Sequence, residues 1–144
     1  MPVYVDTSAL VKRYVHEAQS LAFDAFVSSS DDAFVVSPLT LTELESVLQR
    51  RLRQGDFDKR YLQRTRLLIG NDLVGALWQV RPFEPRAFDE ASRLVRELGV
   101  PLATLDALHL ASAHAFQCDQ LATSDRQLAR AAAHSGLTIH DFSS

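Results

Sequence analysis

Residues 3–12 have the sequence VYVDTSALVK, and residues 120–128 have the sequence QLATSDRQL. Each stretch begins with a short run typical of a buried β-strand and continues into a helical pattern. An Asp lies at the junction in both, Asp6 in the first and Asp125 in the second. Because ligand sites of open α/β sheets gather at the carboxyl ends of strands, we expect these carboxylates to lie close together if their strands are neighbours.

Elsewhere, β-like runs alternate with longer helical patterns, which predicts an α/β fold with a central, mainly parallel sheet flanked by helices on both sides. No internal repeat, low-complexity tract or linker interrupts the chain, so residues 1–144 are expected to form one domain. The expected strands are 3–5, 33–36, 77–80, 120–123 and 137–140, and the expected helices are 7–17, 20–27, 40–54, 57–71, 86–98, 104–116 and 126–135.

The composition is that of an ordinary globular protein, with 47% hydrophobic and 23% charged residues. Cys118 is the single cysteine, which excludes an intrachain disulfide and a thiol-based zinc cluster and suits a reducing compartment. The amino terminus does not have the pattern of a signal peptide, and no stretch approaches the roughly 18 apolar residues of a membrane helix. We therefore expect a soluble, cytoplasmic protein with no membrane partner.

The basic residues are unevenly distributed. The net charge is −3, yet the segment from Arg50 to Arg66 carries +5 and the remainder carries −8. A basic patch beside a group of acids would serve a metal-dependent nuclease, because phosphates must be attracted while cations are held. A solvated helix face is the alternative explanation. If the patch does bind RNA, the candidate residues are Arg50, Arg53 and Arg60.

Glu43 has two explanations. It stands three residues after Thr40, which is the spacing of a capping box at a helix start. The same first turn would also direct its carboxylate toward the edge of the sheet. The helix that follows has one apolar stripe and is expected to end at Gly55; the stripe consists of Leu41, Leu44, Leu48 and Leu52.

Asp106 interrupts an apolar helical stretch, and no Lys or Arg occurs between Arg96 and Arg126 to pair with it. An Asp buried there costs several kcal/mol unless it is paired or binds a metal. A place in the first turn of the helix would ease the charge. Asp106 is therefore the acid whose surroundings most favour a functional role.

Asp6 and Asp125 can each be explained as helix caps, although Thr7 or Ser8 could cap the first helix and leave Asp6 free. Taken together with Glu43 and Asp106, they form a set of hard oxygen ligands, which indicates Mg²⁺ or Mn²⁺ rather than zinc. Such an ion can activate water and neutralise charge on a phosphodiester. The histidines lack ligand spacing, and His109 is expected to be a packed helix residue near the site.

Four segments resemble the PIN-domain nucleases. VYVDTSALVK at residues 3–12 resembles their opening, and Thr42-Glu43 after the second strand matches their second acid. LDALHLASA at residues 105–113 resembles the helix that bears the third acid, and LATSDRQL at residues 121–128 resembles the strand end that bears the fourth. The resemblance covers essentially the whole chain, in order. It is weakest between Asp56 and Pro85, so no role is carried over to the basic residues there.

Single-domain PIN proteins of this size are most often the VapC toxins of VapBC toxin–antitoxin modules. The resemblance therefore implies a Mg²⁺- or Mn²⁺-dependent endoribonuclease that cuts structured RNA such as tRNA or rRNA. It also implies a homodimer and a small VapB-like antitoxin whose tail enters the active-site groove. Carried over by position, the metal ligands would be Asp6, Glu43, Asp106 and Asp125, supported by the hydroxyls of Ser8 and Thr123.

Other functions remain open at this stage. A PIN nuclease could serve RNA processing or act on DNA, and an inactive PIN-like module could only bind. The presence of all four acids argues against the inactive module. An aspartyl phosphatase of the haloacid dehalogenase type also begins with a strand and an Asp, but it needs a second Asp where this chain has Ser8.

Overall fold

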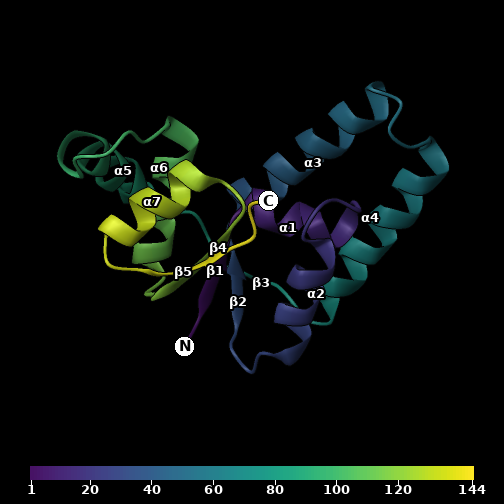
Figure 1. The fold of residues 1–144 in the computed structure, drawn as a ribbon, viewed down its shortest axis with the longest axis horizontal. Coiled ribbons are helices and arrows are strands. Elements are labelled where there is room, and N and C mark those ends of the chain that lie inside the picture. Colours follow the sequence, from purple (N-terminus) through teal and green to yellow (C-terminus); the bar gives the residue numbers. More distant parts are fainter.

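The computed structural model describes residues 1–144 and contains one sheet of five parallel strands, in the order β3-β2-β1-β4-β5 (Figure 1). In the register of the sheet, Val3 lies opposite Phe34 on one side and Gln120 on the other. The predicted α/β fold is confirmed. The strands are β1 (Val3–Val5), β2 (Phe34–Val36), β3 (Gln79–Val80), β4 (Gln120–Thr123) and β5 (Thr138–Asp141).

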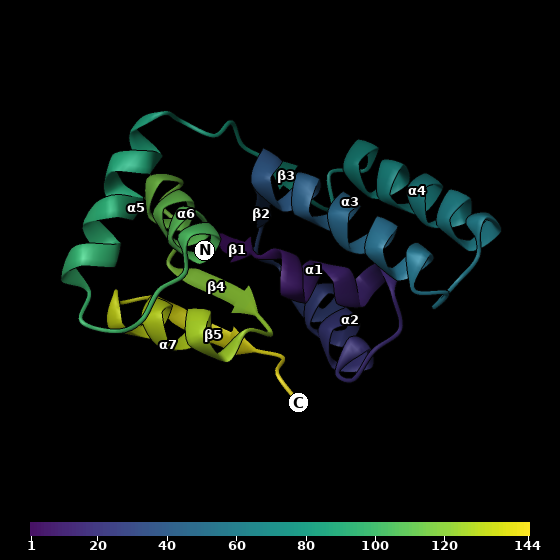
Figure 2. The ribbon, with the colours of Figure 1, turned by 90° about the horizontal axis from the view of Figure 1, so that it is seen from above.

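Helices cover both faces of the sheet, as expected. Figures 1 and 2 show α1 to α4 gathered on one side and α5 to α7 on the other. None of the helices is long and apolar enough to cross a membrane. The helices are α1 (Thr7–Tyr14), α2 (Ser20–Ser29), α3 (Pro38–Arg53), α4 (Lys59–Val74), α5 (Arg86–Glu97), α6 (Thr104–Ala115) and α7 (Arg126–His134).

Two hydrophobic cores lie on opposite faces of the sheet. Successive residues of a strand point to opposite faces, so Val3 and Val5 belong to the core beneath α1 to α4, whereas Tyr4 belongs to the core beneath α5 to α7. Each core contains 17 buried residues, so neither face of the sheet is left to solvent. Fully buried strands with side chains on both faces are typical of parallel sheets.

Helix α3 begins earlier than the sequence suggested, and the predicted capping box of Thr40 and Glu43 is wrong. Ser37 is the N-cap, its hydroxyl accepts from the backbone N–H of Thr40, and Pro38 occupies the first turn. Pro fits there because its missing N–H would have no partner inside the helix. Thr40 takes the third position of the box instead, so Glu43 has no capping role.

The cap of α1 also differs from expectation. The helix is capped by Asp6 rather than by Thr7 or Ser8, and it ends at Tyr14 instead of Glu17. Val15 is extended, and the Lys12 ammonium group then donates to the carbonyl of Ala18, which closes the turn into α2 at 2.7 Å.

An ion pair joins α4 to α1 outside the pocket described below. The buried carboxylate of Asp72 accepts two hydrogen bonds from the guanidinium of Arg13, at 2.7 and 2.9 Å, and one from the hydroxyl of Tyr14 at 2.6 Å. The indole N–H of Trp78 in turn donates to the Tyr14 hydroxyl at 2.6 Å. Through these bonds, the long α3–α4 pair is fixed to the helix that carries Asp6 at its start.

Candidate active site

The topology places a crevice beside the carboxyl ends of β1 and β4. The chain proceeds from β1 to β2 and β3 toward one edge, and β4 and β5 complete the other edge. The connections that follow β1 and β4 therefore leave in opposite directions, which is the arrangement that forms ligand sites in open α/β sheets. A pocket of about 530 Å³ opens there. It is lined by all four predicted acids, Asp6, Glu43, Asp106 and Asp125.

Asp6 is the most buried of these acids, with 3% of its surface exposed. Its carboxylate accepts from the backbone N–H of Ala9 at 3.1 Å and from the hydroxyls of Ser8 at 2.8 Å and Thr123 at 3.0 Å. Burial nevertheless raises the pKa of Asp6, because these hydrogen bonds and the nearby His109 offset only part of the lost hydration. These contacts come from hydroxyl and backbone N–H groups, and no Lys or Arg binds the carboxylate.

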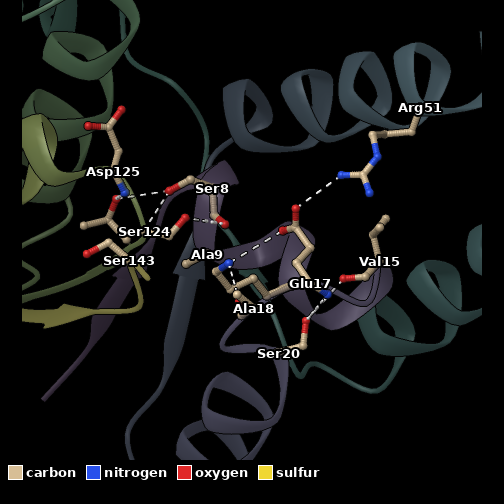
Figure 3. Close-up of polar contacts among 12 residues, drawn as sticks. Ser8, Ala9, Val15, Glu17, Ala18, Ser20, Arg51, Ser124, Asp125 and Ser143 are labelled. Carbon is tan, nitrogen blue, oxygen red and sulfur yellow. Dashed lines mark hydrogen bonds and ion pairs between the residues drawn. The ribbon is translucent and has the colours of Figure 1, made fainter. Parts of the chain in front are cut away.

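Hydroxyl groups join the ends of β1 and β4 at this point. The Ser8 hydroxyl accepts from the backbone N–H of Ser124 at 2.9 Å, and the Ser124 hydroxyl donates to the Ser8 carbonyl at 3.0 Å (Figure 3). The Thr123 hydroxyl accepts from the backbone N–H of Asp125 at 3.0 Å while it contacts Asp6. Ser8 and Thr123 therefore both bind the Asp6 carboxylate, and Thr123 reaches Asp125 only through its backbone.

Asp125 caps α7 with one carboxylate oxygen. Its Oδ1 accepts from the backbone N–H groups of Gln127 at 2.8 Å and Leu128 at 3.1 Å. Its Oδ2 makes no hydrogen bond to the protein, and the residue lines the pocket. Capping and ligand binding, which looked like rival explanations in the sequence, are compatible because the carboxylate has two oxygens.

Asp106 lies in the first turn of α6, at the rim of the pocket rather than deep in the core. Its neighbour Leu105 is 48% exposed, so the apolar surroundings expected from the sequence are only partly present. Burial and, to a smaller extent, the negative charges of Asp125 and Asp6 together raise the pKa of Asp106 to about 6. Like charges that converge in this way are stabilised by a cation.

Glu43 projects from α3 into the same pocket. Its Oε1 accepts from the Thr7 hydroxyl at 2.9 Å and contacts Nε2 of His109, whose side chain is only 2% exposed. Burial alone would raise the pKa of Glu43, but its interactions with His109 and the hydrogen bond from Thr7 outweigh burial, and the pKa is lowered. The sequence placed His109 near the site as a packing residue, and its position three residues after Asp106 was the only signal of a direct contact.

Cationic side chains line the other end of the pocket. They are Lys12, Arg50 and Arg51, together with the acid Glu17. Figure 3 shows the guanidinium of Arg51 directed toward Glu17, at 3.2 Å, and Lys12 is 3.7 Å from the same carboxylate. Arg50 is exposed and forms no ion pair. Of the three arginines predicted to bind RNA, Arg50 lies in the pocket, whereas Arg53 and Arg60 do not line it.

The family model described as the PIN domain matches residues 3–134, which is most of the chain. This chain belongs to the PIN domain family. The match spans the four acids and all the strands except β5. A search of curated proteins finds no match.

Solved structures with the same fold include several toxins. VapC20 of Mycobacterium tuberculosis, a Sarcin-Ricin loop cleaving toxin, is 16% identical with a TM-score of 0.68 over 90% of this chain and 94% of that one. VapBC2 from Rickettsia felis, bound to a promoter DNA fragment, is 16% identical with a TM-score of 0.67 over 99% of both chains. PAE2754 from Pyrobaculum aerophilum is 24% identical with a TM-score of 0.67 over 96% of this PIN domain and 83% of that chain.

PIN nucleases generally use a divalent metal, and the donors of this PIN domain suit one. Four carboxylates from four elements line one pocket, and the charges of the other three all raise the pKa of Asp106. Only oxygen donors meet there besides His109, a set that suits Mg²⁺ or Mn²⁺. In the present rotamers, no three His, Cys, Asp or Glu side chains form a group that could hold an ion. Metal binding therefore requires these side chains to converge further.

Proposed function

We propose that this chain is a Mg²⁺- or Mn²⁺-dependent endoribonuclease and the toxin component of a type II toxin–antitoxin module of the VapBC kind. The observation that carries the proposal is the meeting of Asp6, Glu43, Asp106 and Asp125 in one pocket, where charge repulsion and burial hold the pKa of Asp106 at about 6. A structural role does not explain why four carboxylates should share one pocket without a Lys or Arg bound to any of them.

Different side chains of the pocket would have different roles in hydrolysis. Asp6, Glu43, Asp106 and Asp125 would hold the ion, and the hydroxyls of Ser8 and Thr123 fix the orientation of Asp6. A divalent cation in such a site supplies Lewis-acid chemistry, which lowers the pKa of water and neutralises charge on the phosphodiester. The basic end of the pocket attracts the RNA backbone, and Arg50 is free to contact a phosphate.

The central experiment tests the requirement for metal. Purified protein is incubated with labelled tRNA and rRNA in Mg²⁺, in Mn²⁺ and in excess EDTA, and cleavage is followed on gels. We expect cleavage with either ion, none in EDTA, and full recovery when Mn²⁺ is added back. Asp6→Ala should be inactive in every condition, because it removes the carboxylate at the centre of the site. Full activity in EDTA would refute metal-dependent hydrolysis.

The toxin assignment includes partners. Structures with the same fold include a DNA-bound VapBC from Salmonella typhimurium and a toxin–antitoxin complex from Klebsiella pneumoniae. By analogy, the partner of this chain is a small VapB-like antitoxin whose tail covers the pocket, and the chain pairs with a second copy as a homodimer. The exposed side chains Phe88, Val95 and Leu105 on α5 and α6 offer apolar surface for assembly. The nuclease activity does not depend on this part of the proposal.

Arg50 provides a test of RNA binding that is separate from catalysis. Replacement by Ala should weaken RNA binding about fivefold and reduce its salt dependence by about one phosphate contact, because the side chain lies in the pocket and forms no ion pair. Arg53→Ala is the matched control, since Arg53 is exposed on the same helix but does not line the pocket. Fluorescence anisotropy with labelled RNA over a range of KCl concentrations measures the affinity and its salt dependence for each variant. Equal effects of the two changes would mean that the basic helix acts only as a diffuse positive surface.

A further inference from the structure

A buried chain of hydrogen bonds runs from the sheet to Glu43. The hydroxyl of Tyr4, whose side chain is 0% exposed, lies 2.7 Å from Nδ1 of His109, and Nε2 of the same ring contacts Oε1 of Glu43. Ser37 Oγ and Thr40 Oγ1 stand 3.1 and 3.4 Å from the Tyr4 hydroxyl. Three separate elements, β1, α6 and α3, are linked in this way.

When the imidazole of His109 is neutral, only one assignment of donors and acceptors satisfies all the hydrogen bonds between Glu43, His109 and Tyr4. The carboxylate of Glu43 can only accept, so Nε2 must carry the proton and donate. Nδ1 is then an acceptor, and the Tyr4 hydroxyl donates to it. The Tyr4 oxygen accepts in turn from Ser37 or Thr40, whose hydroxyls also cap α3. Every buried polar atom in this series of hydrogen bonds has a partner, which fixes the tautomer and the plane of His109.

The two oxygens of Glu43 have different surroundings. Both His109 and Thr7 bind Oε1, whereas Oε2 makes no hydrogen bond to the protein. Glu43 lines the pocket that also contains the other three acids. Hydrogen bonds to one oxygen of a carboxylate set its orientation and leave the second oxygen available, which is how outer partners orient metal ligands in proteins.

We propose that His109, held by Tyr4, is a positioning residue that binds one oxygen of Glu43 and leaves the other directed to the metal. This inference rests on the proposed function, because it assumes that the pocket binds a divalent ion. A packing role would require only the size and burial of the ring. The positioning role requires a donor at the place of Nε2, and substitutions at His109 can separate the two.

Two amide substitutions at His109 separate the roles of its two ring nitrogens. In His109→Gln, the longer side chain can place its amide N–H near the position of Nε2 and keep the bond to Glu43. In His109→Asn, the shorter amide lies near the position of Nδ1, so it keeps the contact with Tyr4 and loses Glu43. We expect Mn²⁺ to bind 10- to 100-fold more weakly to the Asn variant and less than about fivefold more weakly to the Gln variant. His114→Asn, on the same helix but bonded to Ser135 outside the pocket, should bind Mn²⁺ as the wild type does.

The experiment titrates Mn²⁺ into the purified protein and follows free Mn²⁺ by electron paramagnetic resonance, with thermal unfolding of each variant in EDTA measured in parallel. Weaker Mn²⁺ binding by the Asn variant than by the Gln variant supports the positioning role, and the reverse order overturns it. Equal affinity in wild type, Asn and Gln, or an equal loss in both variants, overturns it. If neither variant folds, Tyr4→Phe decides, because it keeps the ring packing and removes only the hydroxyl; unchanged affinity then refutes the proposal. A wild-type protein that binds no Mn²⁺ would instead refute the proposed function itself.

Discussion

In the Asp106→Asn protein, we expect metal-dependent RNA cleavage to fall by roughly a thousandfold or more, while the protein becomes more stable in EDTA. The loss of activity follows from removing one of the four proposed metal ligands, since ions in such sites supply most of the stabilisation of the phosphodiester transition state. The gain in stability follows from relief of the lost hydration and, after it, of the charge repulsion, which together raise the pKa of Asp106 to about 6. The combination of lost activity and gained stability is therefore a specific expectation for this substitution.

The gain in stability of Asp106→Asn should depend on pH. A carboxyl whose pKa is raised from 3.8 to about 6 on folding favours the protonated form, so its contribution to stability is greatest below pH 3.8 and is lost as the pH rises through 6. A shift of about 2 units corresponds to about 3 kcal/mol, and solvent screening at the rim of the pocket reduces it to about 1–2 kcal/mol. Asn cannot ionise, so the variant should gain this amount above pH 6 and little near pH 4.

Urea denaturation in EDTA at pH 4.5 and 7.5 measures this difference, with cleavage assayed on the same preparations. Asp89→Asn, an exposed acid on α5, is the control and should change neither property. Induced expression should arrest growth with the wild-type gene and not with Asp106→Asn. If the variant is inactive but less stable at pH 7.5, then Asp106 has a structural role that this electrostatic explanation omits. An equally toxic variant would show that catalysis is not the cause of toxicity.

The second large effect is expected in the stability of Asp72→Ala. Removal of this carboxylate leaves the guanidinium of Arg13 and the hydroxyl of Tyr14 without their shared acceptor. Breaking one partner of a largely buried ion pair costs about 3 kcal/mol, because the remaining charge keeps its desolvation penalty. Since Asp72 does not line the pocket, cleavage per folded molecule should be unchanged.

The pH profile of Asp72 has the opposite sign to that of Asp106. Burial alone would raise the pKa of Asp72, but the hydrogen bonds from Arg13 and Tyr14 outweigh it and the pKa is lowered. Its contribution to stability is therefore present above its ordinary value near 3.8 and is lost as the pH falls below it. Urea denaturation of wild type and Asp72→Ala at pH 7 and pH 3 measures the difference. Asp58→Asn is the control, because Asp58 is the exposed N-cap of α4 and Asn caps helices equally well. A loss below about 1 kcal/mol at pH 7 would mean that Arg13 finds another partner.

Much of the fold could be predicted from the sequence because its signals are local. Apolar runs at strand period and Asp residues at the ends of two runs were sufficient to place Asp6 and Asp125 beside each other once their strands paired. The start of α3 was missed because two hydroxyl residues, Ser37 and Thr40, could each cap it; Pro38, which fits the first turn of a helix, was the local signal in favour of Ser37.

In the candidate site, too, the residues with a local signal were predicted and the contacts between distant residues were not. Asp106 was recognised because an acid without a nearby cation in an apolar stretch is conspicuous, although its position at the rim depends on how far α6 extends beyond the sheet. The contact of His109 with Glu43 was not predicted, because the two residues come from helices on opposite sides of the sheet and meet only beyond its edge. Asp72 was given no role for a similar reason, since its partners belong to α1.

The hydroxyl contacts that join the ends of β1 and β4 have a consequence for biosynthesis. Asp6 is synthesised long before Thr123 and Asp125, which lie near the other end of the domain. Asp6 obtains its bond from Thr123 only after β4 has paired with β1. A chain that has not yet been extended through β4 therefore lacks an assembled site, and the proposed nuclease could not act on the ribosome that is making it.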